Sequence, residues 1–199
     1  MAHFIFDGCD VTELARQYGT PLYVLSERMV RQRLRELRSS FIQRYPDTDA
    51  LYASKALQTM DLVRIVASEG IGLDVVSAGE LYAAVKAGFP VDHIWFHGNS
   101  KTHEELDMAV RYGVGRVVVD NLHELEYLDA SARAAGKRVP ILFRMTPGVD
   151  SHTHSYISTG QLDSKFGIPL DRSVRDSYIG AALGMKGVEL MGFHFHVGS

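Results

Sequence analysis

Short apolar runs rich in β-forming residues recur along most of this chain at intervals of roughly twenty residues, and this spacing constrains the fold more than any other feature. The runs cover residues 51–54, 72–76, 94–97, 116–119, 141–144 and 190–197. A helix-like segment follows each of the first four runs. Strands that alternate with helices in this way predict repeated βα units and therefore a parallel sheet.

Residues suited to begin and end helices stand between these runs. Three pairs place a capping side-chain oxygen three residues before a carboxylate: Ser77 with Glu80, Thr102 with Glu105 and Asn121 with Glu124. Glycines stand where the predicted helices must stop, at Gly70, Gly88, Gly113 and Gly136. This repeating order fits either a closed βα barrel or an open doubly wound sheet. No glycine-rich dinucleotide fingerprint follows the first run, which favours the barrel.

We therefore predict an α/β fold of the (β/α)8 TIM-barrel type, with about six of its eight strands within residues 31–199. Residues 1–30 are predicted to form a separate N-terminal segment, helical over residues 10–18 and extended as a strand over residues 22–25. A further helix is predicted over residues 29–45. Because six units do not close an eight-unit barrel, we expect the remaining strands to lie beyond the last residue.

The first barrel strand ends on a lysine, Lys55, instead of on a turn residue. Burial of an amine at the end of a strand favours its neutral form, which can attack a carbonyl and form a Schiff base. A lysine that closes a strand can equally extend into solvent. Chemistry in βα barrels collects at the carboxyl ends of the strands. Those ends supply Lys55, Asp74, Asn99, Asp120, Arg144, His194, His196 and Ser199.

Charge and cysteine content narrow the function classes. The formal net charge is −3 and no basic run occurs, so we expect neither a nucleic-acid partner nor an anionic membrane surface. No apolar stretch is long enough to span a bilayer. The single cysteine, Cys9, excludes an internal disulfide and a multi-cysteine metal site, and we interpret it as a small buried or incidental residue. These features predict a cytoplasmic protein.

Several stretches resemble the pyridoxal-phosphate-dependent decarboxylases built on the alanine-racemase-like fold: residues 52–56, 72–80, 96–99 and 192–199. Residues 18–24, 152–160 and 164–167 are similar to the diaminopimelate decarboxylases within that group. The resemblance implies that pyridoxal 5'-phosphate is the cofactor and that Lys55 carries it as an internal aldimine. It also implies that His196 stacks on the pyridine ring and Ser199 hydrogen-bonds the phosphate. Asp74 and Arg144 would line the pocket beneath the cofactor.

The implied reaction is decarboxylation of meso-2,6-diaminopimelate to L-lysine and carbon dioxide, the last step of lysine biosynthesis, in a homodimer with a shared active site. In that family a glycine-rich phosphate loop, an acidic partner of the pyridine nitrogen, and a cysteine and a tyrosine of the neighbouring subunit follow the segment seen here. A second, β-rich domain follows as well, and residues 1–30 are expected to pack on it. We therefore expect these 199 residues alone to be inactive.

Other functions remain open at this point. Decarboxylases of ornithine, arginine or carrier-bound amino acids share the implied fold. A metal-dependent barrel hydrolase would use paired histidines, and His194 with His196 and His152 with His154 have that spacing, but the first strand offers Lys55 where such an enzyme needs ligands. We therefore predict no metal, and we interpret the other histidines in strands and loops, namely His93, His97 and His103, as solvated or capping. A non-catalytic regulatory relative would have no use for the amine.

Overall fold

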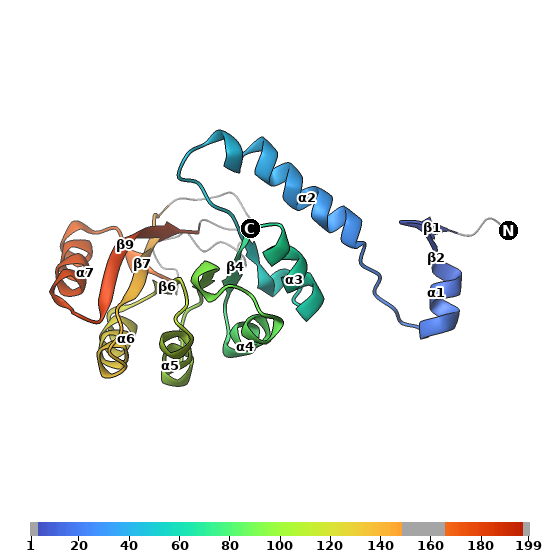
Figure 1. The fold of residues 1–199 in the computed structure, drawn as a ribbon. Coiled ribbons are helices and arrows are strands. Elements are labelled where there is room, and N and C mark those ends of the chain that lie inside the picture. Colours follow the sequence, from blue (N-terminus) through green and yellow to red (C-terminus); the bar gives the residue numbers. More distant parts are fainter. Residues whose placement is uncertain (1–3, 149–165, 197–199) are drawn as a thin grey trace.

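A curved parallel sheet with helices on its outer side forms most of the computed structural model, which describes residues 4–148 and 166–196 (Figure 1). Its main strands lie side by side in chain order: β3 (Leu51–Ala53), β4 (Gly72–Val75), β5 (Ile94–Phe96), β6 (Arg116–Val119), β7 (Val139–Thr146) and β9 (Val188–Phe195). Every neighbouring pair is parallel. This order confirms the predicted α/β fold with a parallel sheet. It also places the carboxyl ends of these six strands together at one end of the sheet.

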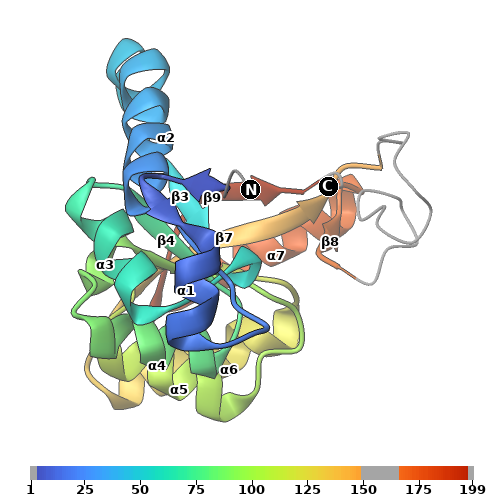
Figure 2. The same ribbon diagram turned by 90° about the vertical axis from the view of Figure 1, so that its right-hand side faces the viewer.

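The outer side of the sheet is covered by the helices α3 (Met60–Ser68), α4 (Ala78–Ala87), α5 (His103–Tyr112), α6 (Leu122–Ala134) and α7 (Arg172–Gly184). Figure 2, turned by 90°, shows α3 to α6 packed along the strands. Their apolar faces bury Leu81, Leu106 and Leu125 completely. Full burial of one such side chain stabilises the fold by about 1.5–3 kcal/mol.

The predicted helix starts are confirmed, although only one is a reciprocal capping box. Ser77, Thr102 and Asn121 each accept a hydrogen bond from the backbone three residues later. The Glu105 carboxylate accepts a hydrogen bond from the backbone N–H of Thr102, which completes the box. The other two carboxylates, Glu80 and Glu124, bind other groups. The predicted glycines follow the helices with positive φ: Gly70, Gly88, Gly113 and Gly136.

The segment after β7 departs from the regular pattern. A strand of two residues, β8 (Ile168–Pro169), pairs with the end of β7 and was not predicted. Met145 of β7 pairs with Phe195 of β9 as well as with Ile168. A strand residue has one neighbour on each side, so β8 lies on the β6 side of β7 and continues the line of β6. This placement sets residues 166–167 over the end of β6.

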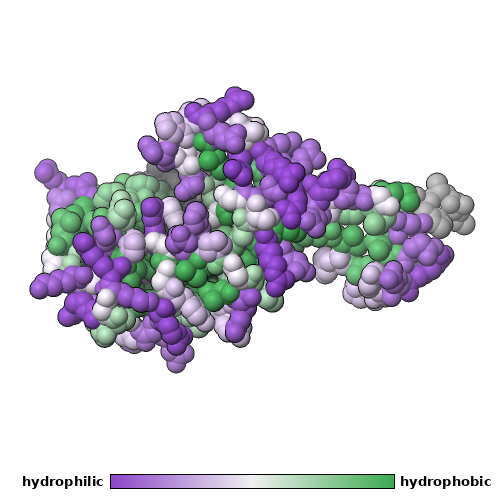
Figure 3. Space-filling model, in the orientation of Figure 1, coloured by the Kyte–Doolittle hydropathy of each residue, from purple (hydrophilic) through white to green (hydrophobic). Residues whose placement is uncertain are grey.

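The N-terminal part forms an arm separate from the barrel segment. It comprises β1 (Ile5–Phe6), β2 (Cys9–Asp10) and α1 (Val11–Tyr18), and Figure 1 shows it well away from the sheet. The predicted strand over residues 22–25 is wrong, because that segment has no pairing partner in the described chain. Apolar side chains are exposed on this arm (Figure 3). Cys9 is exposed as well, so the interpretation of it as a buried residue is wrong.

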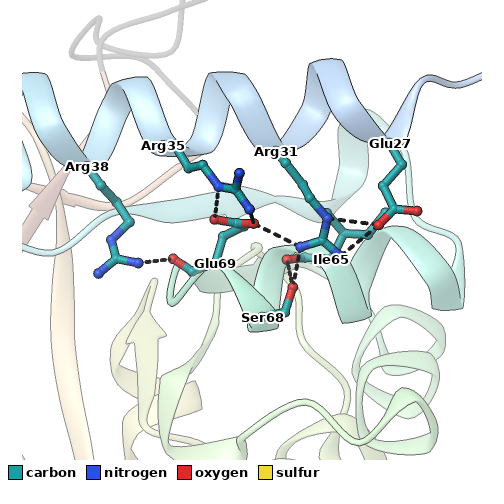
Figure 4. A network of polar contacts seen from close by, with 7 residues as sticks. All are labelled: Glu27, Arg31, Arg35, Arg38, Ile65, Ser68 and Glu69. Carbon is teal, nitrogen blue, oxygen red and sulfur yellow. Dashed lines mark hydrogen bonds and ion pairs between the residues drawn. The ribbon is translucent and has the colours of Figure 1, made fainter. Parts of the chain in front are cut away.

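Helix α2 (Glu27–Ser40) joins the arm to the barrel segment and ends earlier than predicted, with a short 3-10 turn over Ile42–Arg44. It is attached to the end of α3 by the buried Glu69 carboxylate (Figure 4). Arg35 donates two hydrogen bonds to this carboxylate, of 2.8 and 2.9 Å, and Arg31 donates a third of 2.9 Å. In the part of the chain that the structure describes, no helix is both long and apolar enough to cross a bilayer.

Candidate functional site

A cavity of about 330 Å³ opens at the carboxyl ends of the parallel strands. It is lined by Lys55, Asp74, Val76, His97, Gly98, Asn99, Arg144, Phe166, His194 and His196. A larger hollow of about 500 Å³ is lined by residues of the N-terminal arm, of the segment that follows it and of α2, and by none of the residues at the strand ends. Six predicted site residues therefore meet in one cavity. Asp120 lies just outside the lining, and Ser199 lies outside the described residues.

Lys55 stands on the rim of the cavity. It follows β3 within a 3-10 turn, Ser54–Ala56, and its side chain is exposed. Of the two interpretations of Lys55, a buried amine and a side chain that extends into solvent, the structure has the second. Its charge nevertheless acts on the cavity, since Lys55 lowers the pKa of Asp74, His97 and His196.

The turn that carries Lys55 is held by its buried neighbour Ser54. The Ser54 hydroxyl donates to the backbone carbonyl of Asp74, and it lies 3.3 Å from Glu80 Oε2. The same Glu80 oxygen accepts a 2.7 Å hydrogen bond from the backbone N–H of Val76. Glu80 thus connects the ends of β3 and β4, a function that its capping position did not reveal.

Beneath the rim lie Asp74 Oδ1, His97 Nε2 and His194 Nδ1, buried polar atoms that have no hydrogen-bond partner among the residues that the structure describes. His97 Nε2 is 3.7 Å from Asp74 Oδ1, and the His97 and His194 rings meet edge to face with centroids 4.7 Å apart. The prediction that His97 is solvated or capping is wrong, because it is only 9% exposed. A buried polar atom without a partner is costly, so such a cluster is suited to a polar ligand.

Burial controls the charges of this cluster. It raises the pKa of the Asp74 carboxyl to about 6, against the opposing effect of Lys55. It lowers the pKa of His97 to about 3 and that of His194 to about 4, with further lowering by nearby positive charge. Both rings are therefore neutral near pH 7, whereas the Asp74 carboxyl titrates close to that pH.

Arg144, on β7, forms the cationic side of the cavity. Its guanidinium carbon lies 4.4 Å from the centroid of the Phe166 ring. Burial lowers its pKa, while Asp120 and Asp74 raise it. Asp120 follows β6 and accepts a 2.9 Å hydrogen bond from the backbone N–H of Gly167. The cavity therefore combines an amine, a guanidinium, a carboxyl and neutral imidazoles, a set that fits an anionic, hydrogen-bonding ligand with a reactive carbonyl.

The histidine pairs do not build a metal centre in the described chain. His194 and His196 both line the cavity, whereas His152 and His154 lie outside the described residues. Within residues 4–148 and 166–196, no three His, Cys, Asp or Glu side chains come together in a way that could hold a metal ion.

Comparison with known proteins gives a consistent picture. A family model described as "Pyridoxal-dependent decarboxylase, pyridoxal binding domain" matches residues 28–199. The chain is 45% identical over 197 residues to a diaminopimelate decarboxylase of Bacillus methanolicus, covering 99% of this chain and 46% of that protein. It is 43% identical to the diaminopimelate decarboxylase of Bacillus subtilis, with 99% and 45% covered. The chain thus spans about half the length of these relatives.

Solved structures agree. A crystal structure of diaminopimelate decarboxylase from m. jannaschii in complex with L-lysine superposes with a TM-score of 0.88 at 36% identity. The superposition covers 99% of this chain and 46% of that one. The predicted resemblance and the predicted barrel-type fold are thereby confirmed, and so is the predicted pyridoxal cofactor.

Proposed function

The chain belongs to the family of pyridoxal-dependent decarboxylases, of which it contains the pyridoxal-binding domain, and from this premise we propose that it acts in the decarboxylation of meso-diaminopimelate to L-lysine. The observation that carries the proposal is the convergence of Lys55, Asp74, Arg144 and His196 on one cavity. The similarity to diaminopimelate decarboxylases, at 45% and 43% identity, supports the choice of substrate.

The residues present fit pyridoxal phosphate. Its aldehyde needs an accessible amine, and Lys55 is exposed on the cavity rim. Its ring needs flat neighbours and polar partners, and the cavity offers imidazoles and Asp74 Oδ1, which no described residue hydrogen-bonds. Its negative charge is matched by the Arg144 guanidinium. We propose Lys55 as the point of covalent attachment and His196 as the ring that covers one face, with Ser199 as the phosphate partner.

When bound, pyridoxal phosphate supplies an electron sink for the negative charge left on the substrate carbon as carbon dioxide departs. The chain supplies orientation and charge. Arg144 provides a fixed positive charge at one wall, and His97 and His194 remain neutral near pH 7, so they add no competing charge. Asp74, with a pKa of about 6, can exchange a proton within the cavity near neutral pH.

The wider organisation of the protein is part of the proposal. We propose that residues 31–199 form the cofactor-binding barrel domain and that residues 1–30 pack on a β-rich domain. The apolar side chains exposed on the N-terminal arm support a covering partner of that kind. We further propose a cytoplasmic homodimer with a shared active site. Sedimentation of the protein expressed from its complete reading frame tests the dimer.

Borohydride reduction tests the cofactor assignment. The protein expressed from its complete reading frame is incubated with pyridoxal phosphate and reduced, and the pyridoxyl group is located by peptide mass spectrometry. We expect the adduct on Lys55, its loss in Lys55→Ala, and its retention in the control Lys86→Ala, which removes a lysine from α4. Lysine release from meso-diaminopimelate, with ornithine and arginine compared, tests the substrate. No adduct in the wild-type protein would overturn the proposal.

A further inference from the structure

A buried ion pair stands directly behind the cavity wall. The side chains of Lys101 and Glu124 are only 1% and 3% exposed, and Lys101 Nζ is 2.6 Å from Glu124 Oε1. Lys101 Nζ also donates to the backbone carbonyls of Gly98, at 2.6 Å, and Val118, at 2.8 Å. All three of its N–H groups are therefore used, on the loop after β5, on β6 and on α6.

One end of this pair holds the β5 side of the cavity. Gly98 lines the cavity between His97 and Asn99, which line it too. Its φ of +98° is a conformation that favours glycine, and a Cβ there would lie 3.2 Å from the carbonyl oxygen of Val76. The hydrogen bond that Lys101 donates to the Gly98 carbonyl oxygen holds this turn to Val118 of β6 and Glu124 of α6, which Lys101 also contacts.

The other end of the pair leads to the part of the cavity lining that Phe166 forms. Glu124 Oε2 accepts a 3.3 Å hydrogen bond from the backbone N–H of Asp120. Asp120 Oδ1 in turn accepts from the backbone N–H of Gly167, next to Phe166, whose ring contacts Arg144. A continuous series of polar contacts thus runs from Gly98 through the ion pair to the Phe166 wall.

We propose that Lys101 and Glu124 are positioning residues for the cofactor cavity, because they fix the distance between its Gly98 wall and its Phe166 wall. This inference rests on the proposed function, since the cavity must bind pyridoxal phosphate for the spacing to matter. Burial of two charges is costly, and well-packed apolar residues of similar volume often serve a fold equally well. Backbone contacts on both walls give the pair a use that apolar residues could not supply.

The chain offers a matched control in Asp129. Its carboxylate is 9% exposed and accepts hydrogen bonds from Arg133 Nε at 2.8 Å and from the backbone N–H of Gly187 at 2.7 Å. Gly187 immediately precedes β9 and therefore lies at the amino-terminal end of the strands, away from the carboxyl ends that bear the cavity. Asp129→Asn therefore removes a buried negative charge and weakens its hydrogen bonds to Arg133 and Gly187 without changing a residue of either cavity wall.

The experiment uses the protein expressed from its complete reading frame, with cofactor removed. The variants are Lys101→Met, Glu124→Gln and the double variant Lys101→Met/Glu124→Leu, which replaces the pair by apolar contacts in case a single change prevents folding. Pyridoxal phosphate affinity is measured by fluorescence titration, the environment of the bound cofactor by visible circular dichroism, and the stability of the cofactor-free protein by thermal melting. Asp129→Asn is measured in the same way.

We expect the folded Lys101 and Glu124 variants to bind pyridoxal phosphate about tenfold more weakly and to show an altered visible dichroism. Asp129→Asn should lower the melting temperature by about as much as the Lys101 and Glu124 variants do, while its affinity for pyridoxal phosphate stays within about twofold of wild type. Wild-type affinity and dichroism in the folded double variant would overturn the positioning role alone. Failure of the wild-type protein to bind pyridoxal phosphate would instead overturn the proposed function and this inference with it.

Discussion

Asp74 stands in the cavity at a cost to stability that can be measured. Burial raises the pKa of its carboxyl from an ordinary 3.8 to about 6, although its side chain is 20% exposed. At about 1.4 kcal/mol for each pKa unit, the difference amounts to roughly 3 kcal/mol, which partial exposure to water reduces to about 1–3 kcal/mol. Because the pKa of Asp74 is raised in the folded state, the contribution of its carboxyl to the free energy of unfolding is fully present below pH 3.8 and is lost as the pH rises through 6.

Asp74→Asn removes this titration. The unfolding free energy of the cofactor-free variant, taken relative to that of wild type, should therefore be about 1–3 kcal/mol higher at pH 7.5 than at pH 4. Urea unfolding at both pH values, at constant ionic strength, measures the gain. Asp92→Asn is the control, because it removes one negative charge from a side chain that is 75% exposed and outside the cavity. A relative stability of Asp74→Asn that is constant with pH, or that falls as the pH rises, would refute the reasoning.

Three further predictions concern other groups. Arg35 and Arg31 hold the pKa of Glu69 at about 2, so Glu69→Gln should lower the unfolding free energy at pH 7. This loss should shrink as the pH falls from 4.5 towards 2, and urea melts at pH 7 and pH 3 would measure it. His97, with a pKa of about 3, should take up no proton between pH 8 and pH 5, and an NMR titration midpoint near 6.5 would contradict its burial. Glu80→Leu should cost about 2 kcal/mol in urea melts through its lost hydrogen bonds, and unchanged stability would show that they contribute little.

The parts of the fold that could be predicted are those set by local sequence. Apolar runs, capping residues and glycines each act within a few residues, and together they locate the main strands and the helices between them. The shared cavity followed from topology, because the carboxyl ends of parallel strands meet at one edge. Lys55, Asp74 and Arg144 needed only that rule to be placed together.

The parts that could not be predicted depend on neighbours from other units. His97 is buried because His194, from a strand almost a hundred residues later, packs against it, and no local pattern reports that contact. Residues 22–25 have the apolar composition of a strand but no partner to pair with. Ile168–Pro169 is too short to show any periodicity, yet it sets the Phe166 wall of the cavity.

The carboxylates three residues after the helix caps show why a correct local prediction can still miss a function. Each cap needs only the side-chain oxygen of Ser77, Thr102 or Asn121, so the carboxylate that follows is available for a second contact. The Glu80 carboxylate accepts a hydrogen bond from the Ser54 hydroxyl of the preceding unit. The Glu105 carboxylate accepts one from the backbone N–H of Ala78, and the Glu124 carboxylate accepts one from Lys101. In each case the partner belongs to the neighbouring βα unit on the β3 side. The pattern that begins each helix therefore also joins successive strand ends, so the edge that bears the cavity is connected by the fold's own repeats.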